Sequence, residues 1–187
     1  MKARVVPLMP IVRETLSTIL LVLLIGGAGH LAVRSVEVEG ISMLPTVHTG
    51  ELLFVDTLSY RLHSPRRGDI IILHPPVAEQ ENYIKRVIGL PGDRVQVREG
   101  VVYIDGVALS EPYLRLPGHY NWGPARVPAG DYFVLGDNRD ASYDSHMWEP
   151  GKTFLRRDEI VGRAMLAYWP LSDLHLFAGP AYAKVAR

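Results

Sequence analysis

Two hydrophobicity patterns divide the chain near residue 34. Residues 16–33 carry no formal charge and centre on an aliphatic run at 19–25. As a helix this stretch would be roughly 27 Å long, about the thickness of a bilayer core. From residue 35 onward, short segments of alternating apolar and polar residues are separated by glycine, proline and aspartate. The first pattern predicts a membrane-spanning helix, and the second predicts a β domain.

The charges that flank the apolar segment predict its orientation. The basic residues Lys2, Arg4 and Arg13 precede it. Arg34 follows it directly, and the acidic residues Glu37 and Glu39 come soon after. By the positive-inside rule, residues 1–13 are cytoplasmic, residues 14–34 form the transmembrane anchor, and residues 35–187 form an extracytoplasmic domain. The chain would therefore be a single-pass protein of the cell (plasma) membrane.

Two other interpretations of the apolar segment stay open at this point. Its most apolar part is short, and small residues follow at 26–29, which is also typical of a cleaved signal peptide. A buried core helix is the third interpretation.

The extracytoplasmic part is predicted to be mainly β. Strand-like patterns occur at 35–39, 51–55, 69–73, 82–88, 94–98, 101–104, 131–135 and 160–168. Glu99-Gly100 predicts a two-residue hairpin turn, and Asp105-Gly106 predicts a second turn soon after it. We expect a coiled antiparallel sheet or barrel-like domain, with an irregular cap at about 107–130 and a short helix or frayed end at 174–187.

Composition narrows the function. The net charge is zero with 48% hydrophobic residues, so a packed core is feasible and no basic excess points to nucleic acid. Cysteine is absent, which excludes disulfides, thiolate nucleophiles and cysteine-ligated zinc. The seven histidines are scattered without metal-ligand spacing. The sequence therefore predicts neither a metal site nor a cofactor.

A serine and a lysine are the main chemical candidates. Of 20 basic residues only four are lysines, and Lys85 is the one placed in an apolar, strand-like run. A desolvated lysine can lose its proton near neutral pH and act as a general base, which arginine cannot do. Ser42 lies in a turn bounded by glycine and proline. Each residue alone has an ordinary interpretation, a turn serine and a surface lysine; together they suggest a Ser42–Lys85 catalytic dyad.

A third polar segment, residues 135–145, follows a predicted strand. It is also compatible with a turn-rich loop held by local hydrogen bonds. Calcium binding is disfavoured because its carboxylates do not occupy alternate ligand positions and Arg139 lies among them.

Four segments together resemble the bacterial type I signal peptidases, membrane-anchored serine proteases that cleave signal peptides from exported proteins. The resemblance rests on Ser42-Met-Leu-Pro-Thr46, Arg67-Gly-Asp-Ile-Ile-Ile72, Lys85-Arg-Val-Ile-Gly-Leu-Pro-Gly-Asp93 and Gly136-Asp-Asn-Arg-Asp-Ala-Ser-Tyr-Asp-Ser145. They follow an N-terminal apolar segment in the family's order. The compact length and the glycine two residues before the serine are similar to the short Gram-positive-type members.

The resemblance implies a role for each matching residue. Ser42 would be the nucleophile and Lys85 the general base, with Ser142 hydrogen-bonded to the lysine amine. The backbone N–H of Ser42 would bind the oxyanion; many relatives have a serine at the position of Gly40, so here the second donor must be backbone or water. Three further residues would support the site: Arg86 and Asp137 as an ion pair, and Asp144, whose usual arginine partner is replaced by His146.

The resemblance also implies the substrate and its surroundings. Signal peptides end in small residues, often Ala-X-Ala, before the cut. The family's shallow pockets for these residues would be walled by Val36, Val38, Met43, Tyr83 and Ile84, which are equally compatible with an ordinary core. The expected partners are the signal peptides of exported pre-proteins and membrane lipid, with the secretion translocon nearby.

Two rival functions fit parts of this pattern. A LexA-like Ser/Lys autoprotease shares the dyad, but carries a DNA-binding helical domain where this chain has an apolar segment. The other rival is a catalytically inactive, membrane-anchored β-domain that serves as a binding or scaffold module. An activity assay separates the latter from a peptidase.

Overall fold

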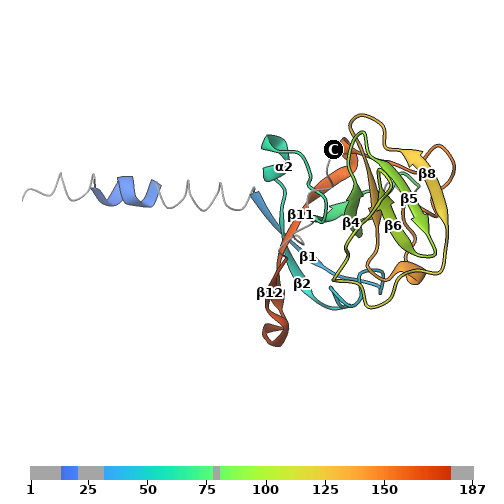
Figure 1. Ribbon diagram of the computed structural model, residues 1–187. Helices are drawn as coiled ribbons and strands as arrows, with labels where there is room; N and C mark the ends of the chain where they lie inside the picture. The colour runs from blue at the N-terminus through green and yellow to red at the C-terminus, as the bar shows by residue number, and fades with distance from the viewer. Residues whose placement is uncertain (1–13, 21–31, 78–80, 178–187) are drawn as a thin grey trace, which may run out of the picture.

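The computed structural model describes residues 14–20, 32–77 and 81–177, and its strands form two antiparallel sheets (Figure 1). The larger sheet has the strand order β1-β2-β11-β3-β4-β9-β10, with β12 paired to β11. Its strands are β1 (Val33–Glu37), β2 (Leu52–Asp56), β3 (Ile70–Leu73), β4 (Tyr83–Gly89), β9 (Asp131–Leu135), β10 (Leu155–Arg156), β11 (Ile160–Trp169) and β12 (His175–Leu176). Three of its seven pairings join strands that are distant in sequence: β2–β11, β11–β3 and β4–β9.

The smaller sheet has the order β7-β6-β5-β8 and is built largely from hairpins. Its strands are β5 (Arg94–Arg98), β6 (Val101–Ile104), β7 (Val107–Ala108) and β8 (Trp122–Arg126). Glu99 and Gly100 join β5 to β6 with φ values of +49° and +77°, as the predicted two-residue turn requires. Asp105 and Gly106 join β6 to β7 in the same way, with φ values of +51° and +87°. Both predicted turns are confirmed.

Three buried clusters fill the space behind these sheets. The first lies under β1, β2 and β3 and includes Met43, Leu53 and Ile84; the second joins the two sheets through Ile88, Val97 and Phe133, among others. The third covers the other side of β3, β4 and β9. Because β4 contributes to all three, it runs through the interior of the domain, and six of its seven residues are buried.

Short helical segments connect the strands. The helix α2 (Ser59–Leu62) follows β2, and three 3-10 turns are η1 (Arg139–Ala141), η2 (Arg157–Glu159) and η3 (Leu171–Asp173). The mainly β, antiparallel fold class predicted from the sequence is therefore correct for the described domain.

The prediction of an irregular cap at 107–130 is wrong in part. The segment contains β7 and β8, and β8 pairs with β5 through Arg94–Arg126 and Val95–Ala125. Glycine and proline inside β8 hide its periodicity in the sequence. Gly123 has a φ of +78°, and a Cβ there would lie 2.9 Å from the Val95 carbonyl, so the strand approaches its neighbour in a way that needs glycine.

The two ends of the chain are described only in part. Residues 14–20 are helical, but 1–13 and 21–31 lie outside the described residues, so most of the predicted anchor does too. Within the described ranges, no helix has both the length and the apolar character needed to cross a bilayer. At the C-terminus, β12 occupies part of the segment predicted as a helix or frayed end, and 178–187 lie outside the described residues.

Candidate active site

Ser42 lies in the loop between β1 and β2, on the wall of a cavity of about 580 Å³. The Met43 side chain packs in the first core cluster and is only 1% exposed, so it fixes this loop to the core. From the other side, the backbone N–H of Asn138 donates to the Ser42 carbonyl at 3.0 Å, and its side-chain amide donates to the Ile41 carbonyl at 3.1 Å. The serine backbone is thus fixed on two sides.

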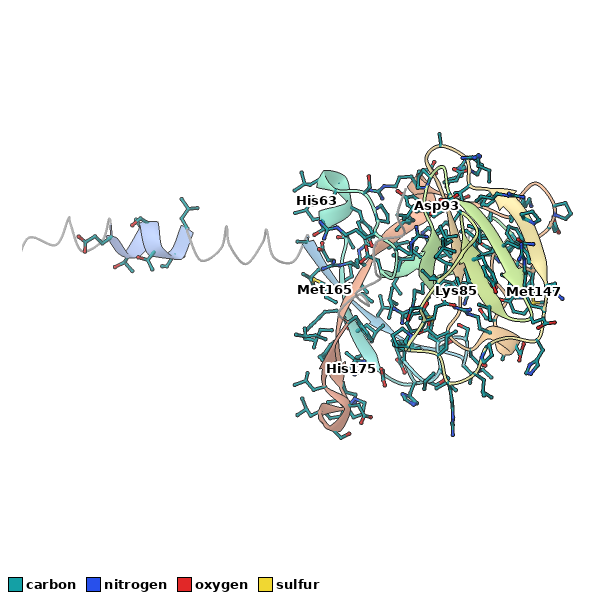
Figure 2. All side chains as sticks on the ribbon, viewed as in Figure 1. His63, Lys85, Asp93, Met147, Met165 and His175 are labelled. Carbon is teal, nitrogen blue, oxygen red and sulfur yellow. The ribbon has the colours of Figure 1, made fainter. Side chains whose placement is uncertain are left out.

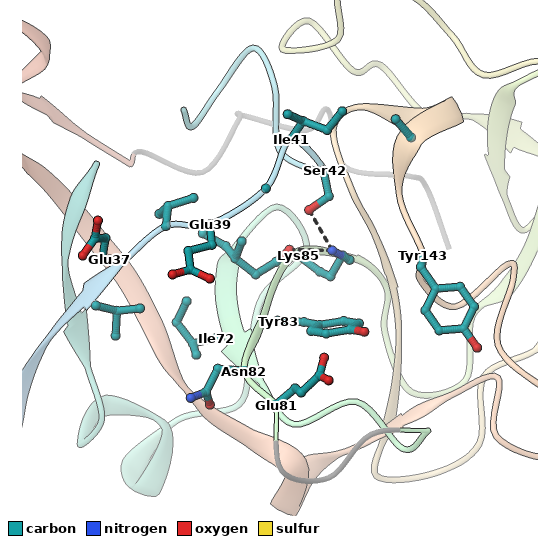
Figure 3. A pocket seen from close by; sticks show the side chains of 15 residues that line it. Glu37, Glu39, Ile41, Ser42, Ile72, Glu81, Asn82, Tyr83, Lys85 and Tyr143 are labelled. Atoms are coloured by element: carbon teal, nitrogen blue, oxygen red, sulfur yellow. Dashed lines mark hydrogen bonds between the residues drawn. The ribbon is translucent and has the colours of Figure 1, made fainter. Parts of the chain in front are cut away.

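Lys85 reaches this loop from the interior strand β4. Its amine donates to Ser42 Oγ at 2.9 Å and to the Ile84 carbonyl at 3.0 Å, and Figure 3 shows the two side chains pointing toward each other. The residue is 3% exposed, and the Tyr83 ring centroid lies 5.2 Å from the amine. Strands β3 and β9 flank β4 on either side. Core clusters also cover both faces of this strand, so the Lys85 side chain is buried.

Burial changes the acidity of this amine. Desolvation lowers the pKa of Lys85 from 10.5 to about 8, because an ammonium ion loses its hydration inside the domain. The carboxylates of Asp144 and Asp137 oppose this shift by favouring the charged form. The net result is an amine that is partly neutral at mildly alkaline pH and can accept a proton from the adjacent hydroxyl.

Gly136, directly after β9, allows three segments to meet beside this pair. A Cβ at this position would lie 2.2 Å from Ser142 Oγ and 2.4 Å from the Ser42 carbonyl oxygen. Real Cβ atoms do not approach other atoms so closely, so only glycine fits this junction.

The structure does not show the contact that was expected of Ser142. The side chain is 3% exposed, and its hydroxyl has no hydrogen-bond partner among the described residues. The expected hydrogen bond to Lys85 is not formed, because the amine instead donates to Ser42 and to the Ile84 carbonyl. A buried hydroxyl without a partner lowers stability by roughly 1–3 kcal/mol. A functional role is one explanation for keeping such a group.

Arg86 and Asp137 form a buried ion pair behind the site. Arg86 Nε donates to Asp137 Oδ1 at 2.8 Å and Nη2 to Oδ2 at 2.6 Å, with side-chain exposures of 3% and 1%. Arg86 Nη1 donates to the Gly68 carbonyl at 2.9 Å, and the Thr46 hydroxyl donates to Asp137 at 2.5 Å. The Tyr113 ring covers the guanidinium at 3.9 Å. The pair joins the serine loop, through Thr46, to β4 and to the end of β9.

Asp144 is fully buried and joins two parts of the third motif. Its Oδ2 accepts the backbone N–H of Gly136 at 2.8 Å, and its Oδ1 lies 2.6 Å from His146 Nδ1. The histidine ring stacks on Tyr120 with centroids 3.9 Å apart and planes 12° from parallel. His146 therefore occupies the position of the arginine that the resemblance implies, and it contacts the same carboxylate.

The cavity beside the dyad has an apolar floor and an acidic rim. Val36, Val38, Tyr83 and Ile84 line it, as the resemblance implies for the pocket walls. Met43 does not: it is buried in the core with Val38 and Ile84. Three carboxylates also line the cavity and are labelled in Figure 3: Glu37, Glu39 and Glu81.

Ser42 and Gly40 supply the backbone of the expected oxyanion site. Gly40 has a φ of +93°, a left-handed conformation that glycine adopts without steric cost. Among the described residues, none accepts a hydrogen bond from the Ser42 N–H. Within the same ranges, no three histidine or carboxylate side chains gather as they would around a metal ion.

Three structural contributors were not assigned a role from the sequence: Gly136, Thr46 and Asn138. All three lie within the segments that carry the family resemblance. Their position in the sequence is therefore the only signal that could have identified them as part of the site. Their roles depend on contacts between the serine loop and the segment after β9, which are some 90 residues apart in sequence. Side-chain type gives no signal for such contacts.

Comparison with known proteins places the chain among peptidases. The family described as "Signal peptidase, peptidase S26" matches residues 11–169. A signal peptidase I of Leptolyngbya laminosa is 48% identical over 149 residues, 75% of this chain and 71% of that protein. A probable signal peptidase I-2 of Synechocystis is 42% identical over 145 residues, 75% of this chain and 65% of that protein. A crystal structure of a signal peptidase I from Enterococcus faecalis is 35% identical and covers 54% of this chain and 97% of that one, with a TM-score of 0.45.

Proposed function

Since the chain belongs to the signal peptidase family, peptidase S26, it is a serine endopeptidase that removes signal peptides, and we propose that Ser42 and Lys85 carry out this reaction as a catalytic dyad. The observation that supports the dyad most directly is the 2.9 Å separation of the Lys85 amine and Ser42 Oγ, with the amine buried. No histidine lies within hydrogen-bond distance of Ser42 Oγ among the described residues, so the lysine is the base at hand.

In the proposed mechanism the neutral Lys85 amine accepts the Ser42 proton as Oγ attacks the scissile carbonyl carbon. The tetrahedral intermediate then expels the new N-terminal amine of the mature protein, which takes the proton from the Lys85 ammonium. Water, deprotonated by the same amine, then attacks the acyl carbon. The bond from this carbon to Ser42 Oγ breaks, Oγ takes the proton back from the Lys85 ammonium, and the signal peptide leaves with a free carboxylate. In each half-reaction Lys85 therefore accepts one proton and then donates it.

The oxyanion of that intermediate would be stabilised by backbone donors. The Ser42 N–H is the first, and we assign the second to the backbone at Gly40 or to water held there, since no serine hydroxyl is present at position 40. Loss of one such donor costs about 3–4 kcal/mol in known serine proteases, so a second donor matters.

Four residues would position the dyad without contacting the substrate. Arg86 and Asp137 brace the serine loop against β4 and β9, and Asp144 holds the Gly136 backbone. We propose that Ser142 orients the lysine amine once substrate displaces the Ser42 hydroxyl from its resting position. Its buried, unpaired hydroxyl supports this role.

The proposed specificity is for small residues at the first and third positions before the cut, as in Ala-X-Ala. The apolar residues Val36, Val38, Tyr83 and Ile84 in the cavity lining support it, since they suit the methyl groups of alanine side chains. Met43 would shape these pockets from beneath, as part of the core on which the walls rest.

We further propose that residues 14–34 anchor the enzyme in the cell membrane, with residues 1–13 in the cytoplasm and residues 35–187 forming the extracytoplasmic peptidase domain. The uncharged stretch 16–33 and the charges beside it support this topology. Anchored in this way, the enzyme would meet membrane-spanning signal peptides by two-dimensional diffusion, close to the secretion translocon.

The test is cleavage of a purified pre-protein by the detergent-solubilised full chain, with the cut mapped by mass spectrometry. We expect one cut after small residues at the first and third positions, and its loss in Ser42→Ala. The matched control is Ser172→Ala, at an exposed serine in η3. Cleavage by Ser42→Ala at the wild-type rate would refute the nucleophile, and no cleavage by the folded wild type would favour an inactive binding module.

A further inference from the structure

A second cavity, of about 440 Å³, lies away from the dyad, among the start of β1, the helix α2, η2 and the first residues of β11. Its charged lining consists of three arginines, one aspartate and one histidine: Arg34, Arg61, Arg157, Asp158 and His74. None of these residues belongs to the proposed catalytic machinery. With His74 neutral, the lining carries an excess of two positive charges.

Two of these arginines have no side-chain partner within the described part of the chain. Arg34 and Arg61 are exposed, and neither makes an ion pair or side-chain hydrogen bond with any described residue. The only carboxylate of the lining, Asp158, accepts a hydrogen bond from Arg156, a residue outside the cavity, at 3.1 Å. The guanidinium groups of Arg34 and Arg61 are therefore available to an external anion.

The third arginine is held in place. Arg157 Nη2 donates to the carbonyls of Tyr60 and His63, at the end of α2, and its guanidinium lies 5.2 Å from the Tyr60 ring centroid. Figure 2 labels His63 at this end of the domain. A fixed guanidinium in the same cavity as two unpaired ones makes a partly preorganised site for phosphate oxygens, since less side-chain entropy is lost on binding.

The position of the cavity indicates where that anion comes from. Arg34 is the first charged residue after the uncharged stretch 16–33, and Arg34 pairs with Val55 in the β1–β2 register, which brings the end of β2 and then α2 to the same end of the domain (Figure 1). Leu58, directly before α2, and Leu62, its last residue, are sequence neighbours of the lining residues Thr57 and Arg61 and are 45% and 76% exposed. Exposed leucines next to unpaired arginines are typical of a surface at the membrane interface, where apolar groups enter the acyl region and cations meet headgroups.

We infer that this cavity binds the phosphate group of an anionic phospholipid headgroup, with Arg34, Arg61 and Arg157 as its ligands. The phosphate chemistry is shared with free inorganic phosphate; the exposed leucines and the adjoining apolar segment favour the lipid. The site is independent of the Ser42–Lys85 dyad, and it would hold the domain at a fixed orientation to the bilayer.

The test uses the full chain in nanodiscs of phosphatidylcholine, with or without phosphatidylglycerol. Thermal unfolding of the β domain is followed by tryptophan fluorescence. We expect phosphatidylglycerol to raise the midpoint by about 6 °C or more, because each of the three arginines is attracted to the anionic headgroups. The double variant Arg34→Gln/Arg61→Gln should lose most of this shift, and Arg34→Lys/Arg61→Lys should keep much of it. The matched control is Arg66→Gln/Arg94→Gln, which removes two exposed arginines outside the cavity and should keep the full shift.

Three outcomes would overturn the lipid site. One is the absence of any shift with phosphatidylglycerol. Another is an equal loss of the shift in the Arg34/Arg61 and Arg66/Arg94 variants, which would show a general charge effect. The third is a full shift with inorganic phosphate in phosphatidylcholine discs at constant ionic strength, which would make it a free-phosphate site. Peptidase activity of the Arg34/Arg61 variant, measured on a soluble peptide, should equal that of the wild type, so a failed lipid site leaves the proposed dyad untouched.

Discussion

The smaller and larger sheets differ in how far apart in sequence their paired strands lie. In the smaller sheet, β5, β6 and β7 follow one another through two-residue turns. In the larger sheet, β2 pairs with β11, and β4 lies between β3 and β9. All residues of the candidate active site are attached to the larger sheet: Ser42 follows β1, Lys85 lies in β4, and Asp137 follows β9.

This difference determines how far the effect of a substitution should spread through the molecule. A hairpin sheet is specified by nearby residues, so a defect in one of its turns stays local. The site depends on loops from distant parts of the chain, which meet around a few buried polar groups. Changes at these junctions should therefore affect activity and stability together, whereas changes in the smaller sheet should cost stability only.

The largest contrast is expected at the dyad itself. Lys85→Met keeps most of the length and volume of the side chain but removes the base, and should lower kcat/KM by about 10³-fold or more, by analogy with other triads and dyads. The measurement is cleavage of a signal-peptide substrate, with circular dichroism to verify the fold. Cleavage within tenfold of the wild type would contradict the base assignment.

Most substitutions of a buried residue lower the free energy of unfolding, but Lys85→Met should raise it at neutral pH. Burial lowers the Lys85 pKa to about 8 from 10.5, so between these values the unfolded chain binds more protons than the native state. The unfolding free energy of the wild type then falls as pH decreases from 10.5 to 8. Lys85→Met lacks this dependence and should be more stable than the wild type at pH 7 by about 3 kcal/mol, but not at pH 10.5. Parallel pH dependences in urea unfolding would contradict the buried, shifted lysine.

The ion pair behind the site should show the next largest effect. Asp137→Ala leaves the Arg86 guanidinium buried without its carboxylate, and should cost about 3–5 kcal/mol in unfolding free energy along with most activity. Glu149→Ala is the control, because Glu149 pairs with Lys152 at 3.8 Å with both side chains about half exposed or more; it should cost less than about 1 kcal/mol. Equal losses in the two variants, measured by urea unfolding, would remove any special role for the buried pair.

Gly136→Ala should cost about 1–3 kcal/mol through overpacking, because the new Cβ meets Ser142 Oγ and the Ser42 carbonyl. Displacement of the serine loop by an ångström should also lower kcat/KM by about 10²-fold. Chemical denaturation and peptide cleavage measure the two effects. An active, stable Gly136→Ala protein would show that the junction is looser than described.

The smallest effect is expected in the smaller sheet. Gly106→Ala places a methyl group in open space at a φ of +87°, so only the left-handed backbone is penalised, by about 1–2 kcal/mol. Activity should equal that of the wild type. A joint loss of activity and stability here would remove the distinction between the two sheets.

The sequence predicted the strands of the larger sheet that alternate clearly, and the hairpins of the smaller sheet. It failed at β8, where glycine and proline interrupt the alternation, and at β10 and β12, which are two residues long and have no period to detect. For the site, the motifs identified Ser42 and Lys85, but the pattern around Lys85 could not show that β4 is an interior strand. The core clusters on both faces of β4 decide the burial of Lys85, and they are assembled by segments that are distant in sequence.

The supporting residues show the same limit. The resemblance named Arg86 and Asp137, and the structure describes their bidentate contact. The resting position of the Lys85 amine, at Ser42 and the Ile84 carbonyl rather than at Ser142, depends on the packing of three segments around Gly136. No single segment contains that information.

The pH dependence of kcat/KM tests the central proposal, a neutral Lys85 as the base for Ser42, most directly. For the full chain acting on a peptide substrate without ionisable groups between pH 6 and 10, we predict a rate that rises with pH and levels off above an apparent pKa of about 8, the value to which burial lowers the Lys85 amine. Each pH unit below that value should reduce kcat/KM about tenfold. A profile that is flat from pH 6 to 9, or that rises only near pH 10.5, would contradict a desolvated lysine base.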